Sequence, residues 1–297
     1  MQYEAHDAFI APARTRPEIW RLLLGLVLCF VVYVFGFAVL FGILVLYSGL
    51  EGAAAWTARM ASEGTPTSTL LILATFVGMA LGPFLAVPLL HGRSVGSLFG
   101  PLRLALRDFL TAMVICGTLY AVLLLVPTGD RPVPNLDLSL WALFVPLALV
   151  GILVQTGAEE VLFRGYLQQQ LAARFASPVV WMVLPGVLFA LGHYQPDIMG
   201  DNAWFIVLAV GLFAILAADL TAVTGNIGAA WGFHFANNCV GILIVGLAGP
   251  LSGLALYTSP FDPANVTDMR PYIFFDMVVT VVTWGLIRYA VTRRLRD

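Results

Sequence analysis

Long apolar runs separated by short polar connections dominate the chain. The first run, from Leu22 to Tyr47, is long enough to cross a hydrocarbon core of roughly 30 Å, which takes about 20 helical residues. Further runs of the same character follow it to the C-terminus. The pattern predicts an all-α polytopic transmembrane helical bundle. About eight spans are expected, at residues 20–48, 69–90, 108–127, 140–162, 178–194, 203–223, 228–249 and 271–291.

Composition supports this interpretation. Of the 297 residues, 60% are hydrophobic and 11% are charged, whereas ordinary soluble domains carry about 25% charged residues. The net charge of −2 gives no reason to expect a nucleic-acid partner. The apolar composition indicates that the lipid bilayer surrounds the protein. No separate soluble domain or repeat is evident, and residues 1–297 are expected to form a single integral membrane domain.

The basic residues, all arginines, are distributed unevenly between the two sets of connections. One set holds most of them, including Arg14, Arg93, Arg103, Arg174 and Arg293, and the opposite set holds most of the loop acids. The positive-inside rule places the arginine-rich set, and with it both termini, in the cytoplasm. An even number of spans agrees with this orientation. The expected location is the cytoplasmic (inner) membrane of a bacterium.

Two acids and an arginine lie together near the end of the predicted span 140–162, in the order Glu159, Glu160 and Arg164. A charge at the bilayer centre costs about 2.5–3.5 kcal/mol on insertion scales, so such residues are usually functional. Residues four apart share a helix face, which pairs Glu160 with Arg164. Glu159 is rotated by about 100° and is expected to be freer.

Two further spans carry polar residues that can reach the same depth. His193 ends the span 178–194, and His234 and Asn238 share a face four residues apart. In a helical hairpin that turns at Ser177, Glu159 and His193 both lie about 25 Å from the turn. The spacing therefore predicts one polar site, near the cytoplasmic leaflet.

This set of groups is typical of a hydrolytic site. A carboxylate in a low-dielectric pocket can act as a general base on water. A histidine and an asparagine on one face can donate hydrogen bonds to a developing oxyanion. Taken singly, His193 is also typical of a packing histidine, and His234 with Asn238 of interhelical hydrogen bonding. The coincidence of the three clusters favours a site.

Three short motifs follow one another on separate predicted spans: Glu159-Glu160-x-x-x-Arg164, Phe189-x-x-x-His193 and His234-x-x-x-Asn238. Together they resemble the CPBP intramembrane proteases, the CAAX-protease and bacteriocin-processing or Abi family, which includes the type II CAAX prenyl endopeptidases. The resemblance covers about residues 140–249. The earlier spans match only in hydrophobicity.

The resemblance implies a protease whose core is the segment 140–249. In that family's pattern, Glu159 activates water with the help of His193, while Glu160 and Arg164 order the site. The third motif stabilises the oxyanion. The substrate implied is a peptide or protein that is membrane-associated or lipidated, and a prenylated CAAX tail is not required by the motifs.

The cofactor stays open between Zn²⁺ and none. Glu159, His193 and His234 could supply a two-histidine, one-carboxylate zinc set, although ligands on three separate helices are weak evidence for one. Two other functions also stay open. A transporter or proton relay uses intramembrane acids and histidines, but no inverted repeat is detectable. In a catalytically idle scaffold or immunity protein, the polar clusters would only hold helices together.

Overall fold

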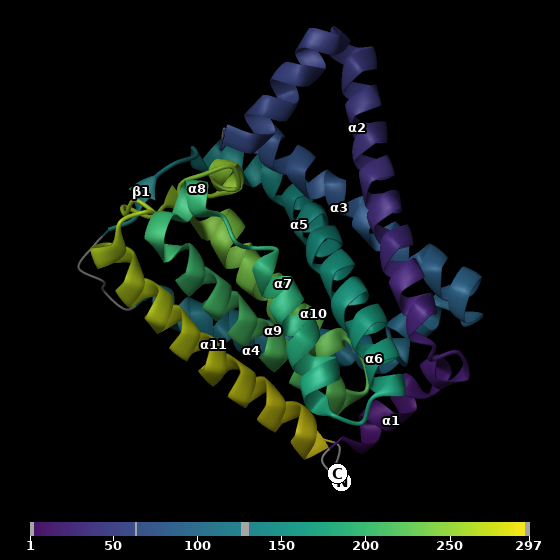
Figure 1. Ribbon diagram of the computed structural model, residues 1–297. Helices are drawn as coiled ribbons and strands as arrows, with labels where there is room; N and C mark the ends of the chain where they lie inside the picture. The colour runs from purple at the N-terminus through teal and green to yellow at the C-terminus, as the bar shows by residue number, and fades with distance from the viewer. Residues whose placement is uncertain (1–2, 63, 126–130, 295–297) are drawn as a thin grey trace.

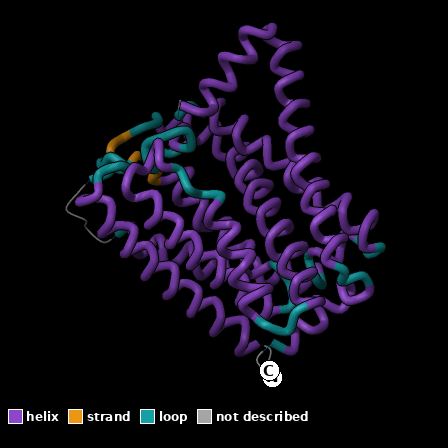
Figure 2. Tube along the Cα trace, in the orientation of Figure 1, coloured by secondary structure: helices purple, strands orange, loops and turns teal. Residues whose placement is uncertain are grey.

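The computed structural model describes residues 3–62, 64–125 and 131–294. The described chain is an all-α bundle, with three two-residue strands gathered at one end (Figures 1 and 2). The α-helices are α1 (Glu4–Ile10), α2 (Ile19–Ser62), α3 (Pro66–Ala86), α4 (Leu102–Leu124), α5 (Leu138–Glu160), α6 (Gln169–Arg174), α7 (Leu184–Leu191), α8 (Pro196–Met199), α9 (Ala203–Thr224), α10 (Gly228–Cys239) and α11 (Val266–Arg294).

Short helical and extended pieces link them. The 3₁₀-helices are η1 (Ala11–Thr15), η3 (Val95–Leu98), η6 (Gly200–Asn202) and η8 (Ser252–Leu254). The π-helical segments are η2 (Val87–His91), η4 (Val161–Gln168), η5 (Val179–Val183) and η7 (Val240–Ile244). Strand β3 (Tyr257–Thr258) pairs antiparallel with β1 (Val133–Pro134) and parallel with β2 (Val245–Gly246).

Within the described residues, six helical segments are long and apolar enough to cross a membrane: Ile19–Ser62, Pro66–His91, Val95–Leu124, Leu138–Arg174, Pro196–Thr224 and Val266–Arg294. The prediction of a polytopic membrane bundle is confirmed, and the chain is an integral membrane protein. The count of eight spans is not confirmed. The predicted span 178–194 contains the shorter apolar helix Val179–Leu191. The predicted span 228–249 is helical only to Ile244, because the chain then becomes extended and pairs with β3.

Helix α2 has two arms that meet at Gly49. This residue has φ 74° and ψ 174°, which lie outside the helical region and are accessible to glycine at little cost. Figure 1 shows the second arm descending from the bend to α3. The first arm exposes large apolar side chains, including Phe30, Phe35 and Leu46, as a surface in contact with lipid does. The predicted first span therefore forms only part of a longer bent helix.

The two ends of the bundle differ. One end, here called the terminal end, holds α1, η1, η3, the end of α6 and the C-terminal part of α11 (Figure 1). The opposite end, here called the far end, holds the three strands and α8. Successive long helices run in opposite directions between these two ends. Both chain termini were predicted to lie in the cytoplasm, and the orientation of the bundle in a membrane stays a prediction.

Helix α10 is held deep in the bundle by close backbone contacts. A Cβ added at Gly228 would lie 1.9 Å from the carbonyl oxygen of Ala105, and one at Gly232 would lie 2.3 Å from that of Phe109. Only glycine permits α10 to approach α4 this closely, in the manner of small-residue packing in membranes. This packing fixes the depth at which the side chains of α10 meet those of α5.

Candidate active site

The two adjacent acids lie at a change in helix geometry. Glu159 and Glu160 end α5, and the next residues form the π-helical segment η4 before α6 continues the same helical run to Arg174. Such π-helical insertions are rare and are frequent at functional sites. Glu160 is fully buried and Glu159 is 6% exposed. The chain therefore places two carboxylates side by side inside the bundle.

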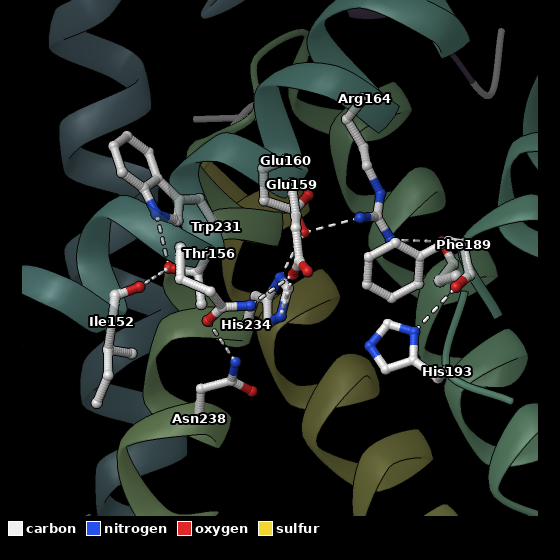
Figure 3. A network of polar contacts seen from close by, with 12 residues as sticks. Ile152, Thr156, Glu159, Glu160, Arg164, Phe189, His193, Trp231, His234 and Asn238 are labelled. Carbon is white, nitrogen blue, oxygen red and sulfur yellow. Dashed lines mark hydrogen bonds and ion pairs between the residues drawn. The ribbon is translucent and has the colours of Figure 1, made fainter. Parts of the chain in front are cut away.

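Helices α5 and α10 are fixed against each other just before the acids. Trp231 donates from Nε1 to the Thr156 hydroxyl at 3.1 Å, and Thr156 donates to the Ile152 carbonyl at 2.8 Å. A Cβ at Gly157 would lie 2.6 Å from the Trp231 ring, so the indole can lie flat over this turn only because the residue is glycine. Figure 3 shows that this contact brings His234 next to the acids.

Glu160 is the centre of an ion-pair cluster. Its Oε1 accepts hydrogen bonds from Arg164 Nη1 and from His234 Nδ1, both at 2.8 Å. Arg164 also donates from Nη2 to the Ala214 carbonyl at 3.1 Å and lies over the Phe189 ring. The predicted pairing of Glu160 with Arg164 is confirmed. The cluster fixes the orientation of the His234 ring.

Glu159 contacts the other side of the same imidazole. His234 Nε2 lies 3.3 Å from Glu159 Oε2, which also accepts a hydrogen bond from Gln155 Nε2 at 2.7 Å. Gln155 in turn accepts a hydrogen bond from Asn238 Nδ2 at 2.8 Å. Because His234 Nδ1 donates to Glu160, its Nε2 is the ring nitrogen that faces Glu159.

His193 reaches the site from the far side. It follows the C-terminal end of α7, and its Nδ1 donates to the Phe189 carbonyl at 2.9 Å. That bond leaves Nε2 as the acceptor of the neutral ring. No direct bond joins His193 to the acids in the described chain. Figure 3 shows its ring across from Glu159 and His234, beyond Phe189.

A cavity of about 780 Å³ borders Glu159. Its polar lining includes Gln155, Glu159, His193 and Asn238, and most of the remaining lining is apolar. A smaller cavity of about 200 Å³ is lined by His193 and His234 together with Asp276 of α11. Glu159 and His193 thus border the larger cavity, and His193 and His234 border the smaller one, so His193 lies on both. Neither cavity is lined by all three groups, and their predicted joint role in one pocket stays a prediction.

The predicted zinc ligands do not form a ready-made metal site. Within residues 3–62, 64–125 and 131–294, no group of three or more His, Cys, Asp or Glu side chains is arranged to hold a metal ion. His234 already uses one ring nitrogen on Glu160, and His193 uses one on a backbone carbonyl. Both bonds use Nδ1 and leave Nε2, which is also how metal-bound histidines are held, so the zinc expectation stays open between zinc and none. No step below passes through a metal.

Sequence reasoning missed Gln155, which links Glu159 to Asn238. Its position four residues before Glu159, on the same helix face, was the available signal. Asp276 of α11 was not among the predicted site residues, yet it lines the smaller cavity. Helix spacing along α11 could not have revealed this, because the contact depends on how α11 packs against α9 and α10.

Asp219 of α9 has a different environment from that of the site acids. Its Oδ1 accepts a hydrogen bond from the Tyr3 hydroxyl at 2.8 Å, and its Oδ2 accepts from Trp284 Nε1 and Arg288 Nε, each at 2.9 Å. Burial and the Asp219 carboxylate raise the pKa of Tyr3 to about 12. These four residues, here called the anchor cluster, join the N-terminal segment to α9 and α11.

Comparison with known proteins locates a relationship in the segment that carries the site. Residues 137–240 match the family model described as type II CAAX prenyl endopeptidase Rce1-like. A protein of Bacillus subtilis (strain 168), "Uncharacterized protein YyaK", is 33% identical over 104 residues, which are 35% of this chain and 34% of that protein. The chain thus matches about a third of the length of this relative. No solved structure matches the chain.

Proposed function

We propose that the protein is an intramembrane endopeptidase, because residues 137–240 match the family model described as type II CAAX prenyl endopeptidase Rce1-like. It hydrolyses a peptide bond of a membrane-associated or lipidated peptide or protein. The proposal assigns the chemistry to Glu159, which activates a water molecule, and to the polar groups around it. It does not require the substrate to carry a prenyl group.

One observation carries the proposal: a buried carboxylate with an imidazole against it forms part of the wall of a large cavity inside a membrane bundle. Glu159 is 6% exposed, and its neighbours on the cavity wall are Gln155, His193 and Asn238. A carboxylate held only for packing would be enclosed by its partners. A cavity of about 780 Å³ has room for water and for an extended peptide segment.

Glu159 is the general base in this scheme. It removes a proton from water as the water oxygen attacks the carbonyl carbon of the scissile bond, and the proton is later delivered to the leaving amine. His234 shares the proton of Glu159 through Nε2 and is held in place by Glu160, whose own position depends on Arg164. His193 presents its Nε2 as an acceptor for the same water.

Asn238 is the candidate oxyanion donor. Its side-chain amide is oriented by the hydrogen bond to Gln155, which also holds Glu159. A preoriented donor stabilises the charge that develops on the carbonyl oxygen in the transition state. Gln155 is a positioning residue, since it acts through its two neighbours.

Peptide cleavage by the purified protein in lipid nanodiscs tests the proposal. A panel of membrane-anchored peptides, with and without a lipidated cysteine, would be followed by mass spectrometry. We expect the wild type to cleave at least one peptide and Glu159→Gln to be inactive. Glu51→Gln, which changes an exposed acid of α2, is the matched control and should cleave normally. Equal cleavage by Glu159→Gln would overturn the assigned mechanism.

Metal content separates the glutamate mechanism from a zinc mechanism. We propose that no metal ion takes part, because no group of three or more His, Cys, Asp or Glu side chains in the described residues is arranged to hold one. Elemental analysis of the purified active protein, together with cleavage after treatment with a chelator, is the measurement. Stoichiometric zinc whose removal abolishes cleavage, and whose return restores it, would establish the alternative.

A further inference from the structure

The smaller cavity adjoins the larger one beside the candidate active site. The residues that line both cavities are Phe189, His193, Ile206, Asn237 and Asn238. The smaller cavity, of about 200 Å³, therefore has a common wall with the cavity that borders Glu159. A peptide bound with its scissile bond at Glu159 and Asn238 would have this second pocket next to it.

Asp276 of α11 brings an unpaired carboxylate to the smaller cavity. It lies inside the membrane-spanning helix Val266–Arg294, about 15 Å from its first residue at 1.5 Å per residue. Within the described part of the chain, no hydrogen bond or ion pair joins it to another residue. Acids inside membrane spans are usually paired or face a polar cavity with a function. The carboxylate of Asp276 is therefore available to a ligand in this cavity.

Thr280 presents a second unused polar group to the same cavity. It lies four residues after Asp276, on the same face of α11. Thr283 and Thr292 of this helix each donate to the carbonyl oxygen four residues earlier, at 2.7 Å. Thr280 makes no such bond to any described residue, although it is 6% exposed. Its hydroxyl is therefore free to bond a group that binds beside Asp276.

The remaining walls of the smaller cavity suit a long side chain with a polar tip. Val210 and Phe213 of α9 line it together with Phe189, so part of its surface is apolar. Asn237, on the wall common to both cavities, accepts a hydrogen bond from the Tyr120 hydroxyl at 3.1 Å. Lysine and arginine side chains place their methylene groups on apolar surface and their charged group on polar partners.

The charges around the two cavities are unbalanced. Glu159 borders the larger cavity and Asp276 the smaller one, whereas no arginine is among the described residues that line either. The neighbouring Arg164 is already bonded to Glu160. A cleft lined by one sign of charge between low-dielectric walls attracts the opposite charge. The site therefore favours a cationic group over a neutral or acidic one.

We propose that the smaller cavity is a specificity pocket for a basic side chain of the substrate, a lysine or an arginine close to the scissile bond. Asp276 forms an ion pair with the ammonium or guanidinium group, and Thr280 accepts a further hydrogen bond from it. The inference deepens the proposed function and rests on it for the identity of the site. Asp276 is a specificity-determining residue in this scheme and transfers no proton.

A peptide panel tests the proposal on the purified protein in lipid nanodiscs. In one membrane-anchored peptide that the wild type cleaves, the residues flanking the cleaved bond would be replaced singly by lysine, glutamine or glutamate. At one position, kcat/KM for the lysine peptide should exceed that for the glutamine peptide by about 10- to 100-fold, as expected for a charge-assisted hydrogen bond. The glutamate peptide should be the poorest substrate.

Asp276→Asn, which keeps the shape of the side chain, should remove this preference by slowing cleavage of the lysine peptide alone. Asp268→Asn changes an acid of the same helix that lines neither of the two cavities, and it is the matched control, which should keep the preference. A preference unchanged in Asp276→Asn would overturn the proposal. An equal loss of kcat for every peptide would also overturn it, because Asp276 would then serve water or proton supply.

Binding without turnover separates this inference from the proposed function. Fluorescent lysine and glutamine peptides would be titrated onto Glu159→Gln protein in nanodiscs and followed by anisotropy. The lysine peptide should bind more tightly, and the difference should vanish in Glu159→Gln/Asp276→Asn. This result supports the pocket even if the wild type cleaves none of the peptides. Equal affinities of the two peptides for Glu159→Gln would contradict the pocket, whatever the outcome of the cleavage assay.

Discussion

Among the described residues, the anchor cluster and the site cluster of Glu160, Arg164 and His234 differ in which hydrogen-bonding atoms they leave unused. In the anchor cluster, both oxygens of Asp219 are bonded, Arg288 is one of the donors, and Asp219 lines neither of the two cavities described. In the site cluster, Glu160 Oε1 takes bonds from Arg164 and His234, but its Oε2 is buried without a partner in the described structure. The neighbouring acid borders a cavity.

The difference shows that charge inside a membrane does not by itself identify a catalyst. In both clusters a carboxylate is buried at a cost in free energy, and both join helices that are distant in the sequence. In the anchor cluster, all the hydrogen bonds to Asp219 hold α9, α11 and the N-terminal segment together. The site cluster holds an imidazole against Glu159, which faces open space. We therefore expect substitutions in the anchor cluster to affect stability and those in the site cluster to affect cleavage.

The largest expected effect is that of His234→Ala. It removes the ring between Glu159 and Glu160, so general-base catalysis should fall by about 10²–10⁴ in kcat/KM. Two adjacent carboxylates would also lose a shared partner, and thermal stability should fall. Cleavage of the best peptide and thermal unfolding in detergent are the measurements. His6→Ala, which alters another buried histidine, is the matched control and should retain cleavage. Normal cleavage by His234→Ala would remove the distinction between the clusters.

Asn238→Ala should lower kcat/KM by about 10²-fold if its amide stabilises the oxyanion. Gln155→Ala should have a smaller effect, because it acts by orienting Asn238 and Glu159. The double variant should be less impaired than the product of the two single effects, since the residues share one hydrogen-bonded chain. Strictly multiplicative effects in this double-mutant cycle would show that Gln155 does not position Asn238.

Asp219→Asn should reduce stability without changing cleavage per folded molecule. Breaking a buried ion pair by altering one partner costs about 3 kcal/mol. The measurement is unfolding in mixed micelles, with kcat/KM determined on the folded fraction. A loss of cleavage at unchanged stability would place the anchor cluster in the mechanism and would contradict the comparison.

The smallest expected effect concerns pH. Burial lowers the pKa of His6 to about 4 from its usual 6.5, and its ring packs 4.6 Å from that of Trp181. Above pH 6.5 the histidine is neutral in both folded and unfolded chains, so its contribution is constant. As pH falls from 6.5 toward 4, only the unfolded chain gains the proton, so folding stability is lost.

Between pH 7 and pH 5 this loss amounts to about 2 kcal/mol. His6→Phe should remove that part of the pH dependence, as measured by unfolding at several pH values. A slope identical to that of the wild type would show that His6 is protonated equally in the folded and unfolded states. Cleavage by the variant at pH 7 should be unchanged.

The sequence was sufficient to predict the pairs that lie along one helix. Glu160 and Arg164 are four residues apart, and helix geometry alone brings them together. The similar depth of Glu159 and His193 was predicted from their distances along a hairpin, and both border the larger cavity. These predictions succeeded because rise per residue and face periodicity are the same in every helix.

The remainder depends on packing between helices, which apolar periodicity does not specify. Hydropathy predicted a full span over 228–249, but it could not show that the chain leaves the helix after Ile244 to pair with β3. Hydropathy also could not show that the chain after the predicted span 20–48 continues as a helical arm beyond the bend at Gly49. The larger cavity is lined by residues of several helices, among them α2, α3, α7 and α9, so its presence could not be predicted from a pattern within any one helix. The side of the membrane from which the cavity is reached stays a prediction.

Cleavage in H₂¹⁸O tests the central claim most directly, because it follows the oxygen atom that Glu159 is proposed to activate. The wild type should place one ¹⁸O atom in the new C-terminal carboxylate of the peptide, as mass spectrometry would show, and Glu159→Gln should form no labelled product. An unlabelled product from the wild type, or labelled product formed at the wild-type rate by Glu159→Gln, would contradict the account.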